Sequence, residues 1–239
     1  MNDKNITNTM PTHWEFNDQV AKVFDEMLSR SIPSYHTFKE IYIQLLLKYT
    51  NEIPGQIRIL DIGCGTLTSS LDLYEKIPNC TLIGIDKSTP MIKQAQNIAR
   101  YRPGITLINK DITTFDVTEF QNIHIALIIF TLQFIPPEDR MSTLQKIYNT
   151  QQQGSIIILA EKTINPHPVT ETLFTETYYK IKEQNQYTKN EINNKKRKLK
   201  RQLIPTTDEF NKELLKGAGY KNISIFWKSL NFTGYIGYK

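Results

Sequence analysis

From Ile57 onward, short apolar runs alternate with stretches of helical periodicity, and this alternation constrains the fold more than any other feature of the chain. Strands that alternate with helices pair into a parallel sheet with helices on both faces. The predicted strands are Ile57–Leu60, Leu82–Ile85, Ile105–Ile108, His124–Phe130 and Ile156–Leu159. The predicted helices between them are Thr68–Lys76, Thr89–Arg100 and Pro137–Thr150. We therefore predict a doubly wound α/β fold with a mostly parallel, Rossmann-like sheet.

The two ends of the chain add helices and a hairpin. Apolar residues recur at helical spacing over Asn17–Arg30, and a second helical segment follows Pro33. The closing runs Ile223–Trp227 and Phe232–Tyr238 are too close together for a crossover helix. We therefore expect them to pair antiparallel, which brings the predicted sheet to seven strands.

The 239 residues fit a single α/β domain, since such domains commonly run to about 200–250 residues. Within it we predict a helical cap over 1–55 and a core over 56–160. The strand signal then lapses, and 161–205 is predicted to be a helical insertion or lid, with a helix at Val169–Gln184. A final helix at Thr207–Lys216 and the hairpin complete the predicted domain over 206–239.

Composition excludes several classes of protein. No apolar run approaches the ~20 residues of a membrane span, and the first residues lack the apolar core of a secretory signal, so we expect a cytoplasmic protein. Cys64 and Cys80 are too few for a metal cluster, and the four histidines lack ligand spacing, so no metal site is expected.

The net charge of +5 is concentrated in one basic run, residues 195–201. Such a run is most often a solvated helix face, and less often a phosphate or carboxylate site. A non-enzymatic RNA-binding module is an alternative, but the run lacks the interleaved aromatic residues that stack on bases. We therefore do not expect direct nucleic-acid binding.

A glycine turn, Asp61-Ile62-Gly63-Cys64-Gly65-Thr66, follows the first predicted strand and precedes a helix. Glycines let the backbone turn sharply and let a ligand approach the main chain, and the helix N-terminus offers unpaired N–H donors. The third glycine of a dinucleotide fingerprint is absent, which disfavours a nicotinamide cofactor. A purely structural turn is the alternative interpretation.

Two further strand ends carry acidic residues. The second predicted strand ends at Asp86, followed by Lys87, where a carboxylate can accept hydrogen bonds from a ribose. The alternative is that Asp86 caps the next helix, a role that Ser88 could equally fill. The third strand ends near Asp111 and Ile112. The carboxylate of Asp111 could accept a hydrogen bond from an adenine amino group, and the side chain of Ile112 could pack against the adenine ring. Together these strand ends predict a nucleoside site at the carboxyl edge of the sheet.

The chain resembles the class I S-adenosylmethionine-dependent methyltransferases, and more closely the carboxy-S-adenosylmethionine synthases that serve transfer-RNA wobble-uridine modification. The matching segments are Trp14-x-Phe16, Val20–Met27, Arg30–Tyr35, Phe130–Phe134, Glu161-Lys162 and Asn231-Phe232. The resemblance implies S-adenosylmethionine as cofactor and a homodimer. It also implies that the cofactor is contacted by Tyr35, Gly63, Cys64, Asp86, Asp111 and Ile112.

Three positions depart from the family pattern. Gly65 stands where the family has serine, and Ile129 stands where it has asparagine. The family arginine that binds a carboxylate aligns with Lys196. Arg197 is the next residue, so a shift of the alignment by one position would place an arginine there. Lysine lacks the bidentate fork of arginine, so this exchange changes how a carboxylate can be held.

Three chemistries on one cofactor remain open, and we rank them in the order given. The first is methyl transfer to a small-molecule acceptor, with Tyr178 and Tyr179 as candidate orienting or deprotonating groups and Glu161 and His167 nearby. The alternative is a purely structural role, with one tyrosine buried in the core and the other on the surface. The second is carboxy-transfer from prephenate, in which the basic run binds a carboxylate. The third needs no second substrate: the cofactor's amine displaces its own sulfur, giving azetidine-2-carboxylate and methylthioadenosine.

Overall fold

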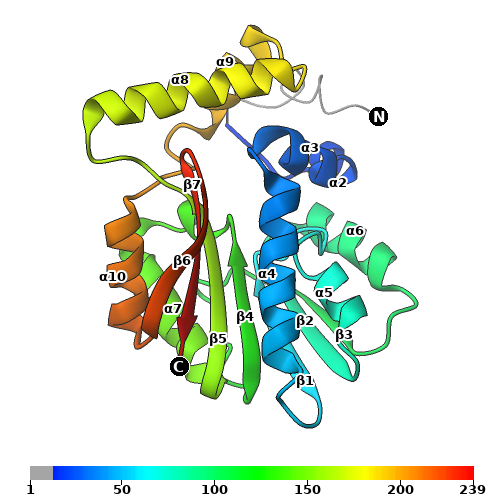
Figure 1. Cartoon of the computed structure of the whole chain (residues 1–239). Helices are drawn as coiled ribbons and strands as arrows, with labels where there is room; N and C mark the ends of the chain where they lie inside the picture. Colours follow the sequence, from blue (N-terminus) through cyan, green and yellow to red (C-terminus); the bar gives the residue numbers. More distant parts are fainter. Residues whose placement is uncertain (1–12) are drawn as a thin grey trace.

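A computed structural model describes residues 13–239, in which one mixed sheet carries the fold (Figure 1). Its seven strands run in the order β3-β2-β1-β4-β5-β7-β6, with β1 to β5 parallel and β7 antiparallel to both β5 and β6. The strands are β1 Ile57–Ile62, β2 Cys80–Asp86, β3 Ile105–Asn109, β4 Ile123–Ile129, β5 Gln151–Lys162, β6 Lys221–Ser229 and β7 Phe232–Tyr238. The predicted doubly wound fold with its closing hairpin is confirmed.

Helices cover both faces of this sheet, because successive residues of each strand point to opposite sides. On one face α4, α5 and α6 pack against Ile59, Ile125 and Ile158, and on the other α7 and α10 pack against Leu60 and Ile128. These helices are α4 Tyr35–Thr50, α5 Leu71–Lys76, α6 Thr89–Ala99, α7 Pro137–Thr150 and α10 Asp208–Ala218. Within residues 13–239, no helix has both the length and the apolarity needed to cross a membrane.

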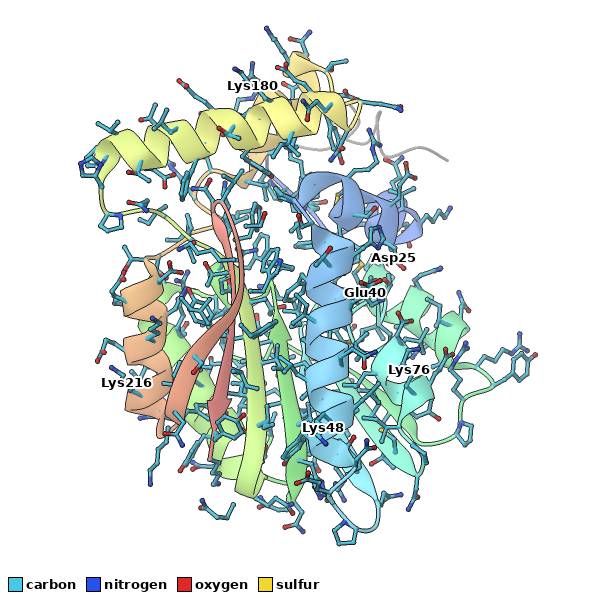
Figure 2. The ribbon with its side chains drawn as sticks, viewed as in Figure 1. Asp25, Glu40, Lys48, Lys76, Lys180 and Lys216 are labelled. Carbon is cyan, nitrogen blue, oxygen red and sulfur yellow. The ribbon has the colours of Figure 1, made fainter. Side chains whose placement is uncertain are left out.

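Charged side chains lie on the outer faces of these helices. Lys48, Lys76 and Lys216, on α4, α5 and α10, are exposed, and so is Lys180 on the helix that crosses the end of the sheet (Figure 2). The strand order reverses between β1 and β4, which are parallel neighbours at the centre of the sheet. From β1 the next strands, β2 and β3, are added toward one edge, and from β4 the next strand, β5, is added toward the other. Open α/β sheets bind ligands at such a switch point, beyond the carboxyl ends of the strands.

The predicted N-terminal helix Asn17–Arg30 is in fact two helices, α2 Asp18–Lys22 and α3 Phe24–Ser31. The backbone of Val23 leaves the helical region between them, and Asn17 caps α2 by accepting from two backbone N–H groups. Hydrophobic periodicity continues across the break, which is why sequence patterning alone did not show it. The first twelve residues of the predicted cap lie outside the described part of the chain.

The predicted insertion contains α8 Pro168–Gln184 and α9 Lys189–Leu199, which we call the lid helices. They cross the carboxyl end of the sheet beside α2 and α3 (Figure 1). Thr188 and Glu191 form a capping box that starts α9. Arg30 donates two hydrogen bonds to the carbonyl of Asn185, whose side chain donates back to the carbonyl of Arg30. These bonds tie the lid helices to the cap.

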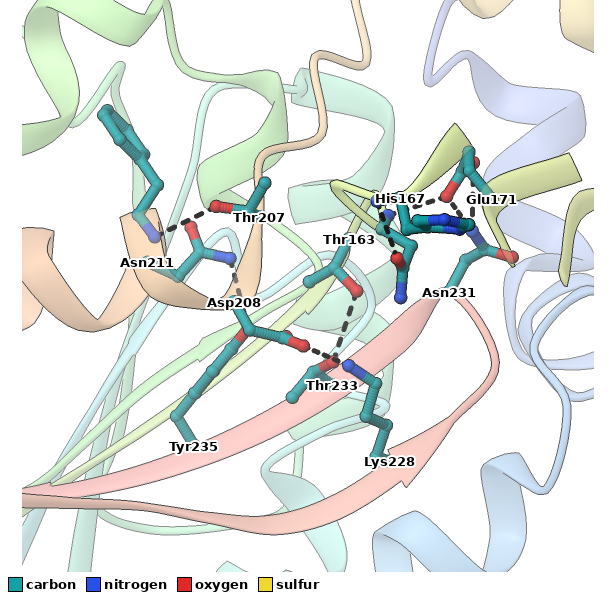
Figure 3. Close-up of polar contacts among 12 residues, drawn as sticks. Thr163, His167, Glu171, Thr207, Asp208, Asn211, Lys228, Asn231, Thr233 and Tyr235 are labelled. Atoms are coloured by element: carbon teal, nitrogen blue, oxygen red, sulfur yellow. Dashed lines mark hydrogen bonds and ion pairs between the residues drawn. The ribbon is translucent and has the colours of Figure 1, made fainter. Parts of the chain in front are cut away.

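The other end of α8 is fixed to the last hairpin (Figure 3). Asn231, at the start of β7, donates to both carboxylate oxygens of Glu171 at 3.1 and 3.0 Å, and the backbone of Asn165 donates to the same group at 2.7 Å. Nearby, Asp208 accepts from Tyr235 and Lys228. The lid helices are therefore attached to the sheet at one end and to the cap at the other.

A buried arginine anchors the loop that follows β4. Arg140 on α7 is 1% exposed and donates to the carbonyls of Ile135 and Ile204 at 2.9 and 2.8 Å. Beside it, the carboxylate of Glu161 accepts from the backbone N–H groups of Leu132 and Gln133. Burial raises the pKa of Glu161 to about 8, while these hydrogen bonds and Arg140 oppose that rise.

We predict that Arg140→Met lowers the free energy of unfolding by about 3 kcal/mol, because it leaves buried carbonyls without donors and removes the charge opposite Glu161. Arg100→Met is the control, since Arg100 is exposed at the end of α6 and should change stability by less than about 0.5 kcal/mol. Urea denaturation of both variants measures the difference. Equal unfolding free energies would show that Arg140 does not anchor this loop.

Candidate active site

A cavity of about 580 Å³ lies at the carboxyl end of the sheet, between the cap and the lid helices. The ends of the parallel strands line it with Gly63, Cys64, Gly65, Asp86, Lys87, Asp111, Ile112 and Ile129. Aromatic rings from the cap, the loop after β4, the lid and β7 line the remainder: Trp14, Phe16, Phe24, Phe130, Phe134, Tyr178 and Phe232. The structure therefore brings eight of the ten predicted cofactor residues to one pocket.

The glycine turn is held against the end of β2. The N–H groups of Gly63 and Cys64 both donate to the carbonyl of Ile85, at 2.7 and 3.1 Å. Gly63 has φ +68°, and a Cβ there would lie 2.2 Å from the hydroxyl oxygen of Thr131. Only glycine fits this position, because a side chain would be strained by the backbone angle and would overlap its neighbour.

Asp86 connects the glycine turn to the start of α6. Its two carboxylate oxygens accept from the backbone N–H groups of Gly65 at 2.9 Å and Ser88 at 2.8 Å. Ser88 supplies the N-cap of α6 through its own hydroxyl, so Asp86 is not needed for that role. Burial raises the pKa of Asp86. Each carboxylate oxygen keeps a lone pair that can accept from a ribose hydroxyl.

Asp111 and Lys87 lie together at the adjacent strand ends. The ammonium of Lys87 is 3.5 Å from one oxygen of Asp111, and the backbone and hydroxyl of Thr113 donate to the other. Partial burial alone would raise the pKa of Asp111, but the hydrogen bonds from Thr113 and the charge of Lys87 lower it. The buried side chain of Ile112 adds an apolar wall beside this carboxylate.

Asp61 and Tyr35, the other two predicted cofactor residues, lie behind the wall of the cavity. One carboxylate oxygen of Asp61 is buried and has no hydrogen-bond partner among residues 13–239. Burial raises the pKa of Asp61 to about 7. Tyr35 is 4% exposed and packs against Phe38 and Phe130. Their contact with the cofactor stays a prediction, and the unpaired oxygen of Asp61 fits a donor that arrives with the ligand.

A contact between the cap and the glycine turn was missed by the sequence analysis. Asp25 on α3 accepts hydrogen bonds from the hydroxyls of Thr66, the last residue of the turn, and of Thr68 just beyond it. No local pattern signals this contact, because more than forty residues separate its partners. It holds the cap over the cofactor end of the cavity.

The lid side of the cavity separates the predicted catalytic residues. Tyr178 is 8% exposed and lines the cavity, whereas Tyr179 lies outside its wall with the ammonium of Lys196 5.4 Å from its ring. Arg197 is exposed and donates to Asn194. The charged residue of the basic run that lines the cavity is Lys195, with Leu199 beside it in the same wall. The sequence alignment could not find it, because a shift of one position on a helix turns a side chain by about 100°.

The loop after β4 is strained where it meets the cavity. Phe130 has φ +54°, a left-handed conformation that bulky residues rarely adopt, and strain of this kind concentrates at functional sites. Gln133 stabilises the loop by donating to the carbonyl of Phe130 and accepting from the backbone of Lys162. Ile129 lines the cavity without any hydrogen-bonding group, at the position where the resemblance implies asparagine.

Comparison with known proteins agrees with this geometry. A family profile described as "Methyltransferase domain" matches residues 59–154. Curated proteins named carboxy-S-adenosyl-L-methionine synthase match the full length of both chains, at 35% identity in Nautilia profundicola and 35% in Helicobacter hepaticus. The chain belongs to the carboxy-S-adenosyl-L-methionine synthase family. It is a transferase whose cofactor is S-adenosylmethionine, as predicted.

Solved structures support the fold alone, since their sequence identities are low. A putative O-methyltransferase from Nostoc punctiforme aligns with a TM-score of 0.65 at 14% identity, over 93% of this chain and 60% of its own. The magnesium protoporphyrin IX methyltransferase of Synechocystis, solved with bound S-adenosylhomocysteine, aligns with a TM-score of 0.63 at 13% identity, over 94% and 96% of the two chains. The class I methyltransferase fold predicted from the strand pattern is confirmed.

We predict that Asp86→Ala weakens S-adenosylmethionine binding by about 10- to 100-fold, because hydrogen bonds to a charged group contribute ~1.5–3 kcal/mol. Isothermal titration calorimetry measures the affinity. Asp116→Ala is the matched control: Asp116 is exposed, does not line the cavity and accepts from a backbone N–H group of its own loop. An affinity in Asp86→Ala equal to that of the control would remove Asp86 from the cofactor site.

Proposed function

We propose that the chain binds S-adenosylmethionine at the glycine turn and at Asp86 and Asp111, and brings a small second substrate to the same cavity. The observation that carries this proposal is that the cofactor-type strand ends and an aromatic chamber share one space of about 580 Å³. This volume lies within the ~300–1,000 Å³ of ordinary small-molecule sites.

Carboxy-transfer is the reaction supported best, because the full-length relatives carry the name carboxy-S-adenosyl-L-methionine synthase. In this reaction the bond between the ring of prephenate and its carboxyl carbon would break, and that carbon would become bonded to the methyl carbon of the cofactor. The proton given up by the methyl group and the hydroxide released as the ring becomes aromatic would leave together as water. The cofactor supplies a methyl carbon activated by the adjacent sulfonium.

The chain's own residues bind, orient and exclude water. The strand-end carboxylates hold the nucleoside, while the rings of Trp14, Phe134 and Phe232 close the reacting end against solvent. Their π faces can also stabilise the positive sulfonium. Holding two reactants in line inside such an enclosure lowers the barrier without a dedicated acid or base. Burial raises the pKa of Tyr178 well above its ordinary value, so its hydroxyl stays protonated and can orient a ligand by hydrogen bonding but cannot act as a phenolate base.

Cyclisation of the cofactor is the second candidate. Ile129 offers no hydrogen bond to a substrate, and Lys196 and Arg197, the residues aligned with the family's carboxylate-binding arginine, do not line the cavity. A pocket without those groups suits a reaction that takes place within the cofactor itself. Methyl transfer to a small acceptor, ranked first from the sequence, is also supported by the methyltransferase-domain match over residues 59–154. Carboxy-transfer ranks above it because the relatives that match the full length carry that name.

We further propose that the chain acts as a homodimer in the cytoplasm. The resemblance to the synthase family supports the homodimer.

One incubation separates the three reactions. The purified protein is mixed with S-adenosylmethionine, with and without prephenate, and the products are followed by mass spectrometry. We expect a carboxylated cofactor that appears only when prephenate is present. Methylthioadenosine with azetidine-2-carboxylate in both mixtures would replace carboxy-transfer by cyclisation. An unchanged cofactor in both would exclude both reactions and direct the search to methyl acceptors.

A further inference from the structure

On the lid side of the cavity, two lysines line the wall without a carboxylate beside them. Lys195 on α9 and Lys162 at the end of β5 both contribute to the wall, and neither ammonium has an acidic oxygen within 4.0 Å among residues 13–239. Lys195 donates to the hydroxyl of Ser31 at 3.1 Å. An ammonium has three donors, so two of those on Lys195 and all three on Lys162 have no protein acceptor in the described chain.

Aromatic rings occupy the places where counter-ions would be expected. The ammonium of Lys195 lies 5.0 Å from the ring of Trp14, and that of Lys162 lies 5.1 Å from the ring of Tyr178. A third lysine, Lys182, is 4% exposed and lies between the rings of Tyr178 and Tyr187, at 5.5 and 4.8 Å. Rings attract cations but carry no net charge. Glu171 acts on Lys162 and Glu191 acts on Lys182 from beyond ion-pair distance, and each partly opposes the lowering of its lysine's pKa. No acidic group acts on Lys195 in this way, so its positive charge is the one that the described residues leave uncompensated.

Placing these lysines in a buried site lowers their pKa values. Burial, and then the charge of Arg30, lower the pKa of Lys195 to about 7. Burial also lowers the pKa of Lys162 and that of Lys182. The charges of Lys195 and Lys162 lower the pKa of Lys182 further. Buried charges are normally paired, and a methionine at position 195 would pack against Trp14 without this penalty. A bound anion would supply the counter-charge that these lysines lack.

We propose that Lys195, together with Lys162, binds a carboxylate of the small-molecule ligand, the role that alignment gives to Lys196 or Arg197. This inference rests on the proposed function only in placing the ligand in the same cavity. Two carboxylates can reach it: that of the second substrate and that of the cofactor's amino-acid end. The chemistry is the same for both, a charge-assisted hydrogen bond from an ammonium to a carboxylate.

The pKa of Lys195 gives this contact a pH dependence. In the free protein Lys195 loses its charge as the pH rises through about 7, and a bound carboxylate stabilises the charged form. Carboxylate affinity is therefore greatest below pH 7 and falls above it. Other charged groups close to Lys195 are Arg30 and Lys182, both cationic. Lys195→Arg remains charged throughout, so it should flatten this profile.

The test replaces Lys195 by glutamine, which keeps a donor for Ser31 but removes the charge. Calorimetry at pH 6.5 measures the binding of S-adenosylmethionine, of its decarboxylated analogue, and of prephenate in the presence of S-adenosylhomocysteine. Lys196→Gln is the matched control, since the neighbouring Lys196 is exposed and lies outside the cavity. Thermal melting of every variant checks that it is folded.

We expect Lys195→Gln to weaken one carboxylate ligand by about 10- to 100-fold, with Lys195→Arg restoring most of the affinity and Lys196→Gln changing it less than about twofold. Loss for S-adenosylmethionine but not for its decarboxylated analogue identifies the cofactor's carboxylate. Loss for prephenate alone identifies that of the second substrate. Affinities equal to those of Lys196→Gln for every ligand would overturn the inference. These are binding measurements, so they are independent of whether carboxy-transfer occurs.

Discussion

The carboxylate of Asp86 accepts one hydrogen bond from the glycine turn after β1 and one from the start of α6, and the cofactor end of the pocket depends on this pair. The turn has little freedom of its own, because Gly63 is enclosed by Thr131 and donates to the carbonyl of Ile85. With the turn and the helix fixed to one side chain, the ends of β1 and β2 keep a constant separation. The nucleoside that we propose binds here would meet a preformed edge, and little binding energy would be spent on ordering loops.

The remainder of the pocket is built by elements outside the sheet, and they are attached to it by polar contacts. Asp25 joins the cap to the residues after the glycine turn, the Arg30–Asn185 bonds join the cap to the lid helices, and Glu171–Asn231 joins the lid helices to β7. The enclosure formed in this way is aromatic and cationic. Such a lining excludes water from a sulfonium centre and leaves positive charge for an anionic group of the ligand.

Much of the fold could be predicted from the sequence, because hydrophobic periodicity and strand-to-helix alternation are local signals. That Gly63, Asp86 and Asp111 line one cavity could be predicted for the same reason, because each strand end is visible in a few consecutive residues. The break at Val23 was missed, since apolar spacing continues across it. The lid side could not be predicted, because whether Lys195 or Lys196 faces the cavity depends on how α9 rotates against the cap. That rotation is set by contacts with Trp14 and Ser31, more than 160 residues earlier in the chain.

The central claim is that the cofactor lies along the carboxyl edge of the sheet with its reactive end in the aromatic and cationic chamber. A crystal structure of the protein with S-adenosylhomocysteine tests it most directly. The account predicts ribose hydroxyls within hydrogen-bonding distance of Asp86, adenine beside Asp111 and Ile112, and the sulfur directed toward Tyr178 and Lys195. A nucleoside bound away from Asp86, or a sulfur directed away from the lid helices, would contradict it.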